Sequence, residues 1–437
     1  MKYYSTNHNS EDVSLSQAVV KGLAPDRGLY MPERLAKLDK SFFDEIDKLS
    51  FQELSFRVAS AFFGEDIPAD DLRKIVYDTL SFETPVVEVE PGIYSLELYH
   101  GPTLAFKDVG ARFMARLLGY FNKNEKDLVN VLVATSGDTG SAVANGFLGV
   151  PGIHVYVLYP KGKVSPIQEC QFTTLGQNIT AVQVDGVFDD CQALVKNAFM
   201  DADLNSKMKL TSANSINVAR FLPQAFYYFN AYAQMKRMGK ADNLVFCVPS
   251  GNFGNITAGL FGWEMGLPVK RFIAANNAND IFFNYLKSGI YSPKPSVQTI
   301  ANAMDVGDPS NFERLRFIFK DDYKKMGEMN KGAWVSDEDT LKEISQFYEE
   351  NNMFIDPHTA VGYVASKRYM EANKPEDTAV VSLSTAHPGK FLEVVEKATG
   401  ARPKLPQNLE RLLKLEKHST VIENTDAALK DYLKAAF

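Results

Sequence analysis

The sequence has few cysteines and no excess of basic residues, and both absences exclude classes of protein. Among 437 residues there are three cysteines, Cys170, Cys191 and Cys247, an odd number without CxxC spacing. This count argues against a disulfide framework and a structural zinc site, and it suits a reducing cytoplasm. The formal net charge of −7 gives no general attraction to nucleic acid or anionic lipid, so neither is expected as a partner.

Long apolar runs are also absent. No stretch approaches about 20 uninterrupted apolar residues, and the polar start MKYYSTNHNSEDVS is unlike a secretory signal. We therefore expect no membrane span, no export and a cytoplasmic location. The composition, 45% hydrophobic and 23% charged, predicts a chain that folds throughout, and its length predicts two or three packed units.

From Asp127 onward, short β-branched runs alternate with longer helical patterns. This alternation predicts an α/β fold whose parallel sheet is covered by helices on both faces. Ligands of such sheets bind beyond the carboxyl ends of the strands, so the loops there should carry the chemistry. Before about Glu90 the pattern predicts a mainly helical unit, and after Arg402 a connection and a terminal helix. The predicted strands are residues 128–135, 153–159, 178–184, 243–250, 270–276 and 378–385.

The segment TSGDTGS, residues 135–141, follows one predicted strand and opens a predicted helix. Its small residues leave backbone N–H groups exposed at a helix N-terminus, where anions bind. The alternative is a tight strand-to-helix turn in which Asp138 caps the helix.

The segment PSGNFGN, residues 249–255, repeats this arrangement after a later strand. Gly251 and Gly254 permit close backbone approach, and Asn252 and Asn255 tolerate left-handed geometry. The segment matches neither the Walker pattern nor the G-x-G-x-x-G fingerprint, which disfavours a nucleotide. Two anion-binding turns predict two anionic groups, such as a cofactor phosphate and a substrate carboxylate.

The segment GPTLAFKDVGARF, residues 101–113, places Lys107 between an apolar stretch and a predicted helix. A lysine amine reacts with carbonyl groups when desolvation or nearby positive charge lowers its pKa. A solvated surface charge is the commoner role of a lysine. Lys107 is therefore a candidate because of the motifs that accompany it.

The segment SANSINVARFLPQ, residues 212–224, supplies Asn214, Ser215 and Arg220. Arginine can bind a phosphate through two parallel hydrogen bonds, while serine and asparagine donate beside it. Spacing alone favours the plainer alternative, a helix cap with a surface arginine.

The segment STAHPGKF, residues 384–391, places Thr385 beside His387 at the end of a predicted strand. An acid–base role is one interpretation of His387. We favour the other, a packed and hydrogen-bonded histidine. We interpret His358 as structural or pocket-forming, and no metal is expected because no HExxH or similar spacing is present.

Taken together, these motifs resemble the threonine synthases of bacteria and fungi. The stretch SLSQAVVKGLAPDRGLYMPE resembles the N-terminal signature of that family. The motifs FKD, TSGDTGSA, NSINVARFLPQ, PSGNFGN, DPHTAVG and STAHPGKF then follow in the family's order. Six ordered motifs are far more specific than any one of them.

The resemblance implies the fold type II architecture of pyridoxal-phosphate enzymes, which tryptophan synthase β also has. Two α/β domains would follow a mainly helical N-terminal extension. The implied boundaries are 1–95 for the N-terminal unit, 96–400 for the catalytic region and 401–437 for a C-terminal segment. A smaller mobile domain is expected within the catalytic region, at roughly 111–215.

The resemblance also implies roles for individual residues. Lys107 would be the catalytic residue and form the Schiff base with pyridoxal 5'-phosphate, and Thr385 would hydrogen-bond its pyridine nitrogen. The residues that match the cofactor-phosphate turn are Gly251, Asn252, Phe253, Gly254 and Asn255. Those that match the substrate-carboxylate loop are Ser136, Gly137, Asp138 and Thr139. Those that match the substrate-phosphate site are Asn214, Ser215 and Arg220.

The activity that the resemblance implies is elimination of phosphate from the γ position of O-phospho-L-homoserine, followed by addition of water at Cβ to give L-threonine. Lys107 would move the protons. The protein would act on this small molecule as a monomer or homodimer. Another fold type II lyase, a dehydratase or phospholyase, is the nearest alternative. A non-catalytic α/β ligand-binding protein is the alternative from a different class.

Overall fold

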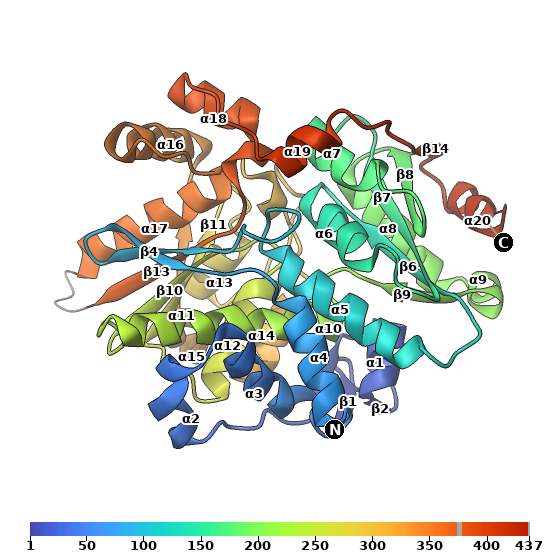
Figure 1. Ribbon diagram of the computed structural model, residues 1–437, viewed down its shortest axis with the longest axis horizontal. Coiled ribbons are helices and arrows are strands. Elements are labelled where there is room, and N and C mark those ends of the chain that lie inside the picture. The colour runs from blue at the N-terminus through green and yellow to red at the C-terminus, as the bar shows by residue number, and fades with distance from the viewer. Residues whose placement is uncertain (374–377, 436–437) are drawn as a thin grey trace. The chain divides into compact units, whose positions relative to one another are not determined.

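The computed structural model describes residues 1–373 and 378–435 of the chain (Figure 1). The chain divides into two compact units and passes repeatedly between them. The first unit contains Met1 and residues 32–106 and 221–404, and the second contains residues 2–31, 107–220 and the chain from 405 onward. The expected smaller domain at roughly 111–215 falls within the second unit, and its mobility stays a prediction.

The first unit is built on a six-stranded sheet in the order β12-β11-β10-β13-β5-β4. Five strands are parallel, and β4 runs antiparallel to β5 at one edge. Every residue of β10 and β13 is buried, which is the burial expected of central strands covered on both faces. The strands are β4 (Val86–Glu90), β5 (Ile93–Glu97), β10 (Leu244–Pro249), β11 (Arg271–Asn276), β12 (Asn330–Trp334) and β13 (Ala379–Ser384).

Several helices of the first unit begin after a Ser or Asp whose side chain accepts a backbone N–H of the first turn. In α3, for example, the Ser50 hydroxyl accepts the N–H of Glu53, and Leu54, Val58 and Phe62 are buried along one face. The α-helices are α2 (Lys40–Glu45), α3 (Phe51–Phe63), α4 (Ala69–Thr79), α11 (Ala225–Arg237), α12 (Gly254–Glu264), α13 (Ile281–Ser288), α14 (Phe312–Phe319), α15 (Tyr323–Met329), α16 (Asp337–Asn351), α17 (Pro357–Asn373) and α18 (Leu392–Thr399). The 3-10 helices are η1 (Ile46–Lys48), η2 (Leu222–Gln224), η3 (Asn302–Met304) and η4 (Pro388–Lys390).

The second unit is built on a five-stranded parallel sheet in the order β14-β8-β7-β6-β9. A smaller sheet, β2-β1-β3, was not predicted from the N-terminal sequence. The strands are β1 (Lys2–Ser5), β2 (Val13–Ser14), β3 (Tyr30–Pro32), β6 (Val129–Ala134), β7 (Ile153–Pro160), β8 (Ile179–Asp185), β9 (Lys209–Ser212) and β14 (Thr420–Glu423). The helices are α1 (Leu15–Lys21), α5 (Lys107–Asn122), α6 (Asp138–Phe147), α7 (Pro166–Thr173), α8 (Phe188–Met200), α9 (Ala202–Lys207), α10 (Val218–Phe221), α19 (Gln407–Leu412) and α20 (Asp426–Ala435).

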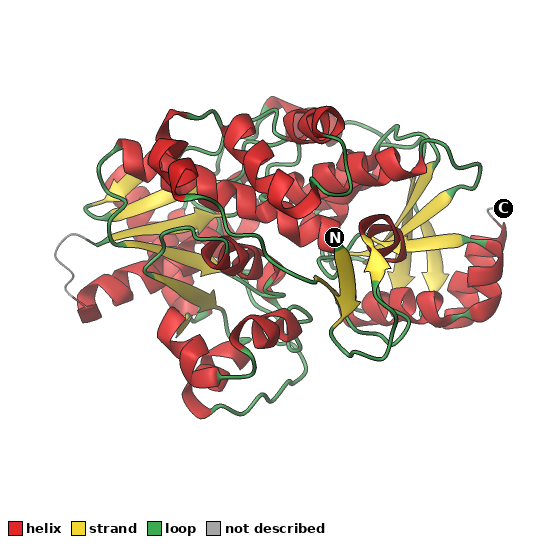
Figure 2. Ribbon diagram, turned by 90° about the horizontal axis from the view of Figure 1, so that it is seen from below, coloured by secondary structure: helices red, strands yellow, loops and turns green. Residues whose placement is uncertain are grey.

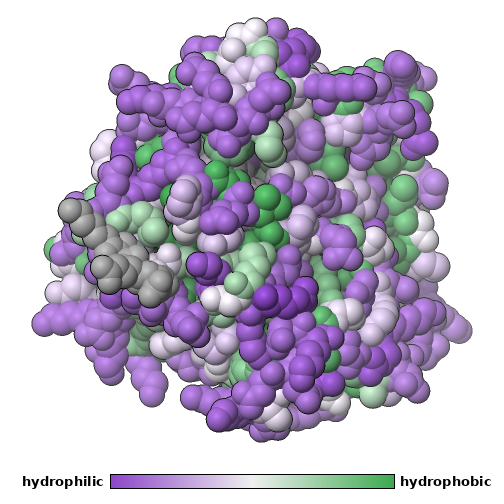
Figure 3. All heavy atoms as spheres, turned by 60° about the vertical axis from the view of Figure 1, so that its left-hand side comes forward, coloured by the Kyte–Doolittle hydropathy of each residue, from purple (hydrophilic) through white to green (hydrophobic). Residues whose placement is uncertain are grey.

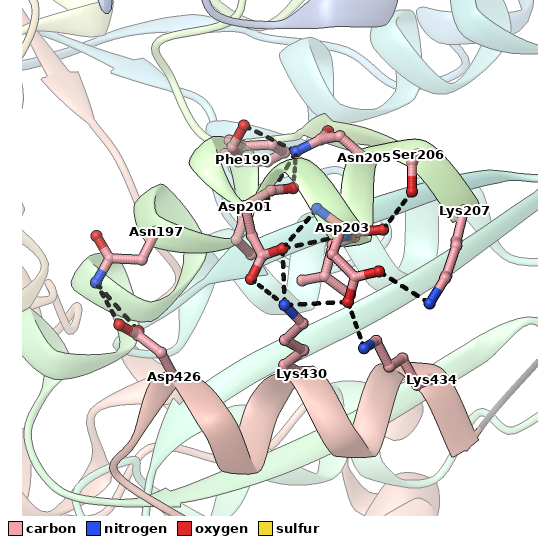
Figure 4. Close-up of polar contacts among 12 residues, drawn as sticks. Asn197, Phe199, Asp201, Asp203, Asn205, Ser206, Lys207, Asp426, Lys430 and Lys434 are labelled. Carbon is pink, nitrogen blue, oxygen red and sulfur yellow. Dashed lines mark hydrogen bonds and ion pairs between the residues drawn. The ribbon is translucent and has the colours of Figure 1, made fainter.

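The C-terminal tail is part of the second unit's sheet, whereas the sequence predicted only a connection and a helix there. Strand β14 pairs in parallel with β8, and α20 packs on α8. Ion pairs hold α20 to the corner between α8 and α9, where Lys430 binds Asp201 and Lys434 binds Asp203 (Figure 4). A strand pairing of this kind depends on a partner more than 200 residues away, which local pattern does not reveal.

In both units the strands lie between layers of helices (Figure 2). The six predicted strands all form, and the predicted α/β class is confirmed. On the face drawn in Figure 3, hydrophilic side chains predominate and hydrophobic ones gather in small groups between them. Within residues 1–373 and 378–435, no helix has the length and apolar character to cross a bilayer.

Candidate active site

Two of the sequence motifs lie at the same edge of the first unit's sheet. Strands β10 and β13 are neighbours and run in parallel, so their carboxyl ends lie side by side, about 5 Å apart. The PSGNFGN turn follows β10, and the STAHPGKF segment follows β13. This is the edge at which parallel sheets bind their ligands.

The PSGNFGN turn leads directly into the N-terminus of α12 at Gly254. Phe253, the residue before it, has the left-handed φ of +59° that lets the chain reverse. The Asn255 side chain stabilises the turn through two hydrogen bonds. It accepts one from the Ser250 hydroxyl at 2.6 Å and donates one to the Pro249 carbonyl at 2.9 Å. The first N–H groups of a helix lack partners within the helix, so this turn presents donors to an anion.

The turn is also fixed from outside. A Cβ at Gly251 would lie 2.7 Å from the Cα of Met304, so only glycine lets these two backbones approach so closely. The Asn252 side chain accepts the N–H of Ser310 at 2.7 Å, and the Asn252 carbonyl accepts the Asn311 side chain at 2.9 Å. The two asparagine side chains of the motif therefore shape the turn, and its backbone N–H groups are the donors that it offers.

Thr385 lies just beyond the end of β13 and is 5% exposed. Its carbonyl accepts the backbone N–H of Phe106 at 2.9 Å, and Ala105 forms a β-bridge with Ala386. Phe106 immediately precedes Lys107. The residue directly before Lys107 is therefore held in place by a backbone hydrogen bond to Thr385.

Lys107 is the first residue of α5 and the first residue of the second unit after the crossing from the first. It is half-buried, while its neighbour Asp108 is completely buried. A Cβ at Gly110, one turn along, would overlap the carbonyl oxygen of Arg220. The first turn of α5 is therefore packed tightly against the end of the NSINVAR segment.

In the second unit, the TSGDTGS loop turns from β6 into α6. The Thr135 hydroxyl accepts the N–H groups of Gly137 and Gly140, each at 2.8 Å, and Gly137 has a φ of +143° that favours glycine. The Asp138 carboxylate is buried and accepts the Gln168 side-chain amide at 2.9 Å. The remaining predicted members of the loop are half-buried: Ser136 and Thr139.

The NSINVAR segment is tied to the same loop by Asn214. The Asn214 side chain donates to the Ala134 carbonyl at 2.9 Å and accepts the Ala134 N–H at 3.3 Å, at the end of β6. Asn214 and Ser215 are both half-buried. The two regions expected to receive the carboxylate and the phosphate of the substrate are therefore adjacent within one unit.

Arg220 is buried, whereas its spacing alone favoured a surface position. Its guanidinium donates to the carbonyl of Ala213, the residue before Asn214. Burial lowers the pKa of Arg220 to about 10, and the nearby carboxylate of Asp108 opposes that shift. The arginine thus lies beneath the loop that carries Asn214 and Ser215.

The histidines pack as the sequence interpretation favoured. His358 is 3% exposed, its Nδ1 bonds Asp356 at 2.7 Å, and its Nε2 accepts the N–H of Ala303 at 3.1 Å. His387 accepts the N–H of Gly389 at 3.0 Å, and burial lowers its pKa. Within the described residues, no group of three His, Cys, Asp or Glu side chains is arranged to hold a metal.

Several contributors to the site were missed by sequence reasoning: Gln168, Ser250, Met304, Ser310 and Asn311. Most of them lie about 30 to 60 residues from the motif that they support. Among these residues, Ser250 alone lies within one of the sequence motifs, PSGNFGN. Its position directly before Gly251 could have indicated a role in the turn.

This arrangement suits pyridoxal phosphate. The helix N-terminus after β10 can receive the phosphate, and the buried hydroxyl of Thr385 after β13 can bond the ring nitrogen. Phe106, which bonds the carbonyl of Thr385, is followed directly by Lys107 and its amine. A family of pyridoxal-phosphate-dependent enzymes matches residues 79–385. The chain is therefore a pyridoxal-phosphate-dependent enzyme, and the predicted cofactor is confirmed.

The flanking regions specify the family. Residues 2–80 match the threonine synthase N terminus, and residues 359–433 match the threonine synthase C-terminal family. The threonine synthase of Haemophilus influenzae is 44% identical over 99% of both chains. The crystal structure of threonine synthase from Escherichia coli covers 100% of both chains with a TM-score of 0.93 and 42% identity. A PLP-bound threonine synthase from Brucella melitensis has a TM-score of 0.91 and 33% identity over 100% of this chain and 99% of its own.

The chain belongs to the threonine synthase family. It is a lyase of threonine biosynthesis, as its motifs predicted, and the alternative of another fold type II lyase is not favoured.

Proposed function

We propose that the protein converts O-phospho-L-homoserine and water into L-threonine and phosphate, with Lys107 as the catalytic residue. The observation that carries this proposal is the bond between Phe106 and Thr385, because it holds the residue before Lys107 at the carboxyl edge of the first unit's sheet. We also propose that it acts in the cytoplasm as a monomer or homodimer. Its three cysteines are buried thiols that form no disulfide, which suits a reducing compartment.

The cofactor would be held at three places. Backbone N–H groups of the turn formed by Gly251, Asn252, Phe253, Gly254 and Asn255 would receive its phosphate. The Thr385 hydroxyl would bond the ring nitrogen, and the Lys107 amine would bond its aldehyde carbon. When bound, pyridoxal phosphate supplies a conjugated ring that withdraws electrons from an attached amino acid.

Lys107 would carry the protons of the reaction. Its amine would remove the proton at Cα of the bound substrate. The same amine would then remove a proton from Cβ as phosphate leaves from Cγ, and Cγ would take up a proton to become the methyl group of threonine. Water would add its hydroxyl at Cβ while its other proton goes to the released phosphate, and Lys107 would return a proton to Cα.

The substrate has an anionic group at each end, and the second unit offers two adjacent loops for them. Ser136, Gly137, Asp138 and Thr139 would receive the carboxylate, mainly through backbone N–H groups, because the Asp138 carboxylate already bonds Gln168. Asn214, Ser215 and Arg220 would receive the phosphate. The link from Asn214 to Ala134 supports this pairing, because a fixed spacing of the two loops would select the length of the substrate.

We further propose that the smaller domain at roughly 111–215 closes on the substrate. Closure would keep bulk water from the unsaturated stages of the reaction until the step at which water adds.

Supplying O-phospho-L-homoserine and measuring two products tests this function. We expect phosphate and threonine to appear in equal amounts. Phosphate accompanied by 2-oxobutyrate and no threonine would instead identify a lyase that lacks the hydration step.

A further inference from the structure

Lys390 is a buried ammonium that no part of the proposed reaction uses. It ends η4 and is 1% exposed. Its Nζ donates to the backbone carbonyl of Thr103 at 2.8 Å. Removing an ammonium from water is costly even when it is hydrogen-bonded, and a methionine of similar length would fill the space without that cost. The charge therefore calls for an explanation beyond packing.

The bonded carbonyl belongs to a strained segment. Leu104, the next residue after Thr103, has a φ of +60°. A bulky residue other than glycine rarely adopts this conformation, and it persists only where the surroundings enforce it. The segment from Gly101 to Phe106 therefore depends on the contacts that surround it.

At least three hydrogen bonds join this segment to residues 385–390 within the first unit. Phe106 donates its N–H to Thr385 at 2.9 Å, and the Leu104 carbonyl accepts the N–H of His387 at 3.0 Å. The third is the bond from Lys390 to the Thr103 carbonyl. The first two bonds join backbone atoms, so they do not depend on the side chains. The bond from Lys390 is made by a side chain, and a substitution of that residue removes it.

We propose that Lys390 is a positioning residue for Lys107. This inference rests on the proposed function of Lys107 as the amine that bonds the cofactor. Thr103 precedes Lys107 by four residues, so the path of this short segment sets where the main chain of Lys107 begins. The buried charge makes a stronger hydrogen bond than a neutral donor and holds that path in its strained form.

Lys390→Met tests the proposal, because it keeps the length of the side chain and removes the donor. In the holoenzyme we expect faster hydrogen exchange in the peptide that covers residues 101–106. We expect kcat to fall about tenfold with less than a twofold change in KM, since a small misplacement of a reacting group costs rate more than binding. The visible circular dichroism of the cofactor, relative to its absorbance, should fall because the amine is held less rigidly.

Lys367→Met is the matched control. Lys367 is a partly buried lysine of the same unit, and its ammonium bonds Glu343 at 2.8 Å and Glu90 at 2.7 Å, in contacts that do not involve the 101–106 segment. It should leave the exchange of that peptide, the dichroism and kcat unchanged. If Lys390→Met does not fold, Lys390→Leu, which also lacks a donor, replaces it.

Exchange, dichroism and kcat all within twofold of wild type in the Lys390 variant would overturn the proposal. A fall in kcat matched by an equal rise in KM, without faster exchange at 101–106, would do the same. Failure of the underlying function is distinguishable, because borohydride reduction of the wild-type holoenzyme would then attach the cofactor to a residue other than Lys107.

Discussion

The backbone N–H of Phe106 donates to the carbonyl of Thr385 at 2.9 Å, across 279 residues of sequence. This bond joins the end of a strand to the residue that precedes Lys107. It holds the main chain just before the proposed catalytic lysine against the residue whose hydroxyl we propose as the partner of the ring nitrogen. The contact thereby links the fold to the proposed function.

Lys107→Ala should abolish covalent attachment of the cofactor and lower turnover by about 10³-fold or more, because the group that moves the protons is removed. Absorption spectra before and after borohydride reduction, with peptide mapping, measure the attachment. Lys123→Ala is the control, since Lys123 is exposed near the end of the same helix and lies over the ring of Tyr120. Retained turnover in the Lys107 variant would rule out its proposed role.

Gly251→Ala should weaken cofactor binding at least tenfold. The added Cβ would lie 2.7 Å from the Cα of Met304. The Cα is a backbone atom and the Cβ is attached directly to the main chain, so neither can rotate away and the proposed phosphate turn itself must move. Equilibrium titration with pyridoxal phosphate measures the effect.

Gly327→Ala provides the matched control for that change. Gly327 lies within α15 and a Cβ there meets no atom within 4 Å, so this variant should be stabilised by up to about 1 kcal/mol and bind the cofactor normally. Equal affinities in the two variants would contradict the proposed phosphate turn.

Arg220→Ala should raise KM for O-phospho-L-homoserine at least tenfold and leave the cofactor bound. It should also lower the free energy of unfolding by roughly 2–4 kcal/mol, because it empties a buried site and removes the donor to the Ala213 carbonyl. Inorganic phosphate should inhibit the variant more weakly than the wild type, and this readout separates a phosphate role from general damage.

Arg402→Ala, which removes an exposed ion pair with Glu396, should change the stability by less than about 1 kcal/mol and leave KM unaltered. Unchanged Michaelis behaviour in the Arg220 variant would count against its assignment to the phosphate site.

Asp305→Asn should change how stability depends on pH. The Asp305 carboxylate accepts the N–H and hydroxyl of Thr299 and the amide of Asn277, and it follows Met304, which packs under Gly251. Burial raises its pKa to about 6, although these hydrogen bonds oppose the shift.

The folded chain therefore binds this proton more tightly than the unfolded chain does. The stability that the group contributes is full below about pH 4 and is lost as pH rises through about 6. The asparagine variant lacks this loss. Its free energy of unfolding minus that of the wild type should therefore rise by roughly 2 kcal/mol between pH 4 and pH 7. Urea unfolding at several pH values measures the difference, and a difference that stays constant with pH would contradict the assignment.

Much of the fold could be predicted from local pattern. The six predicted strands carry β-branched, buried side chains, and such runs specify extended structure wherever they are placed. Strand β14 was missed because it is short and largely exposed, and only its pairing with β8 makes it a strand. Local pattern alone could not assign the strands to two separate sheets, since the same alternation of strand and helix is compatible with one sheet or two. Two α/β domains were expected only from the resemblance to a known family.

The sequence by itself determined the chemical groups of this protein: a lysine before a helix, glycine-rich turns after strands, and the ordered motifs of one enzyme family. The tertiary structure decided which of those groups meet. Asn214 and Ala134 are 80 residues apart, and Lys390 and Thr103 are 287 apart. Local preferences act over a few residues, whereas burial and hydrogen bonding act between any segments that the fold brings within about 3 Å. For that reason a buried Arg220 and a buried Lys390 became visible only in the folded chain.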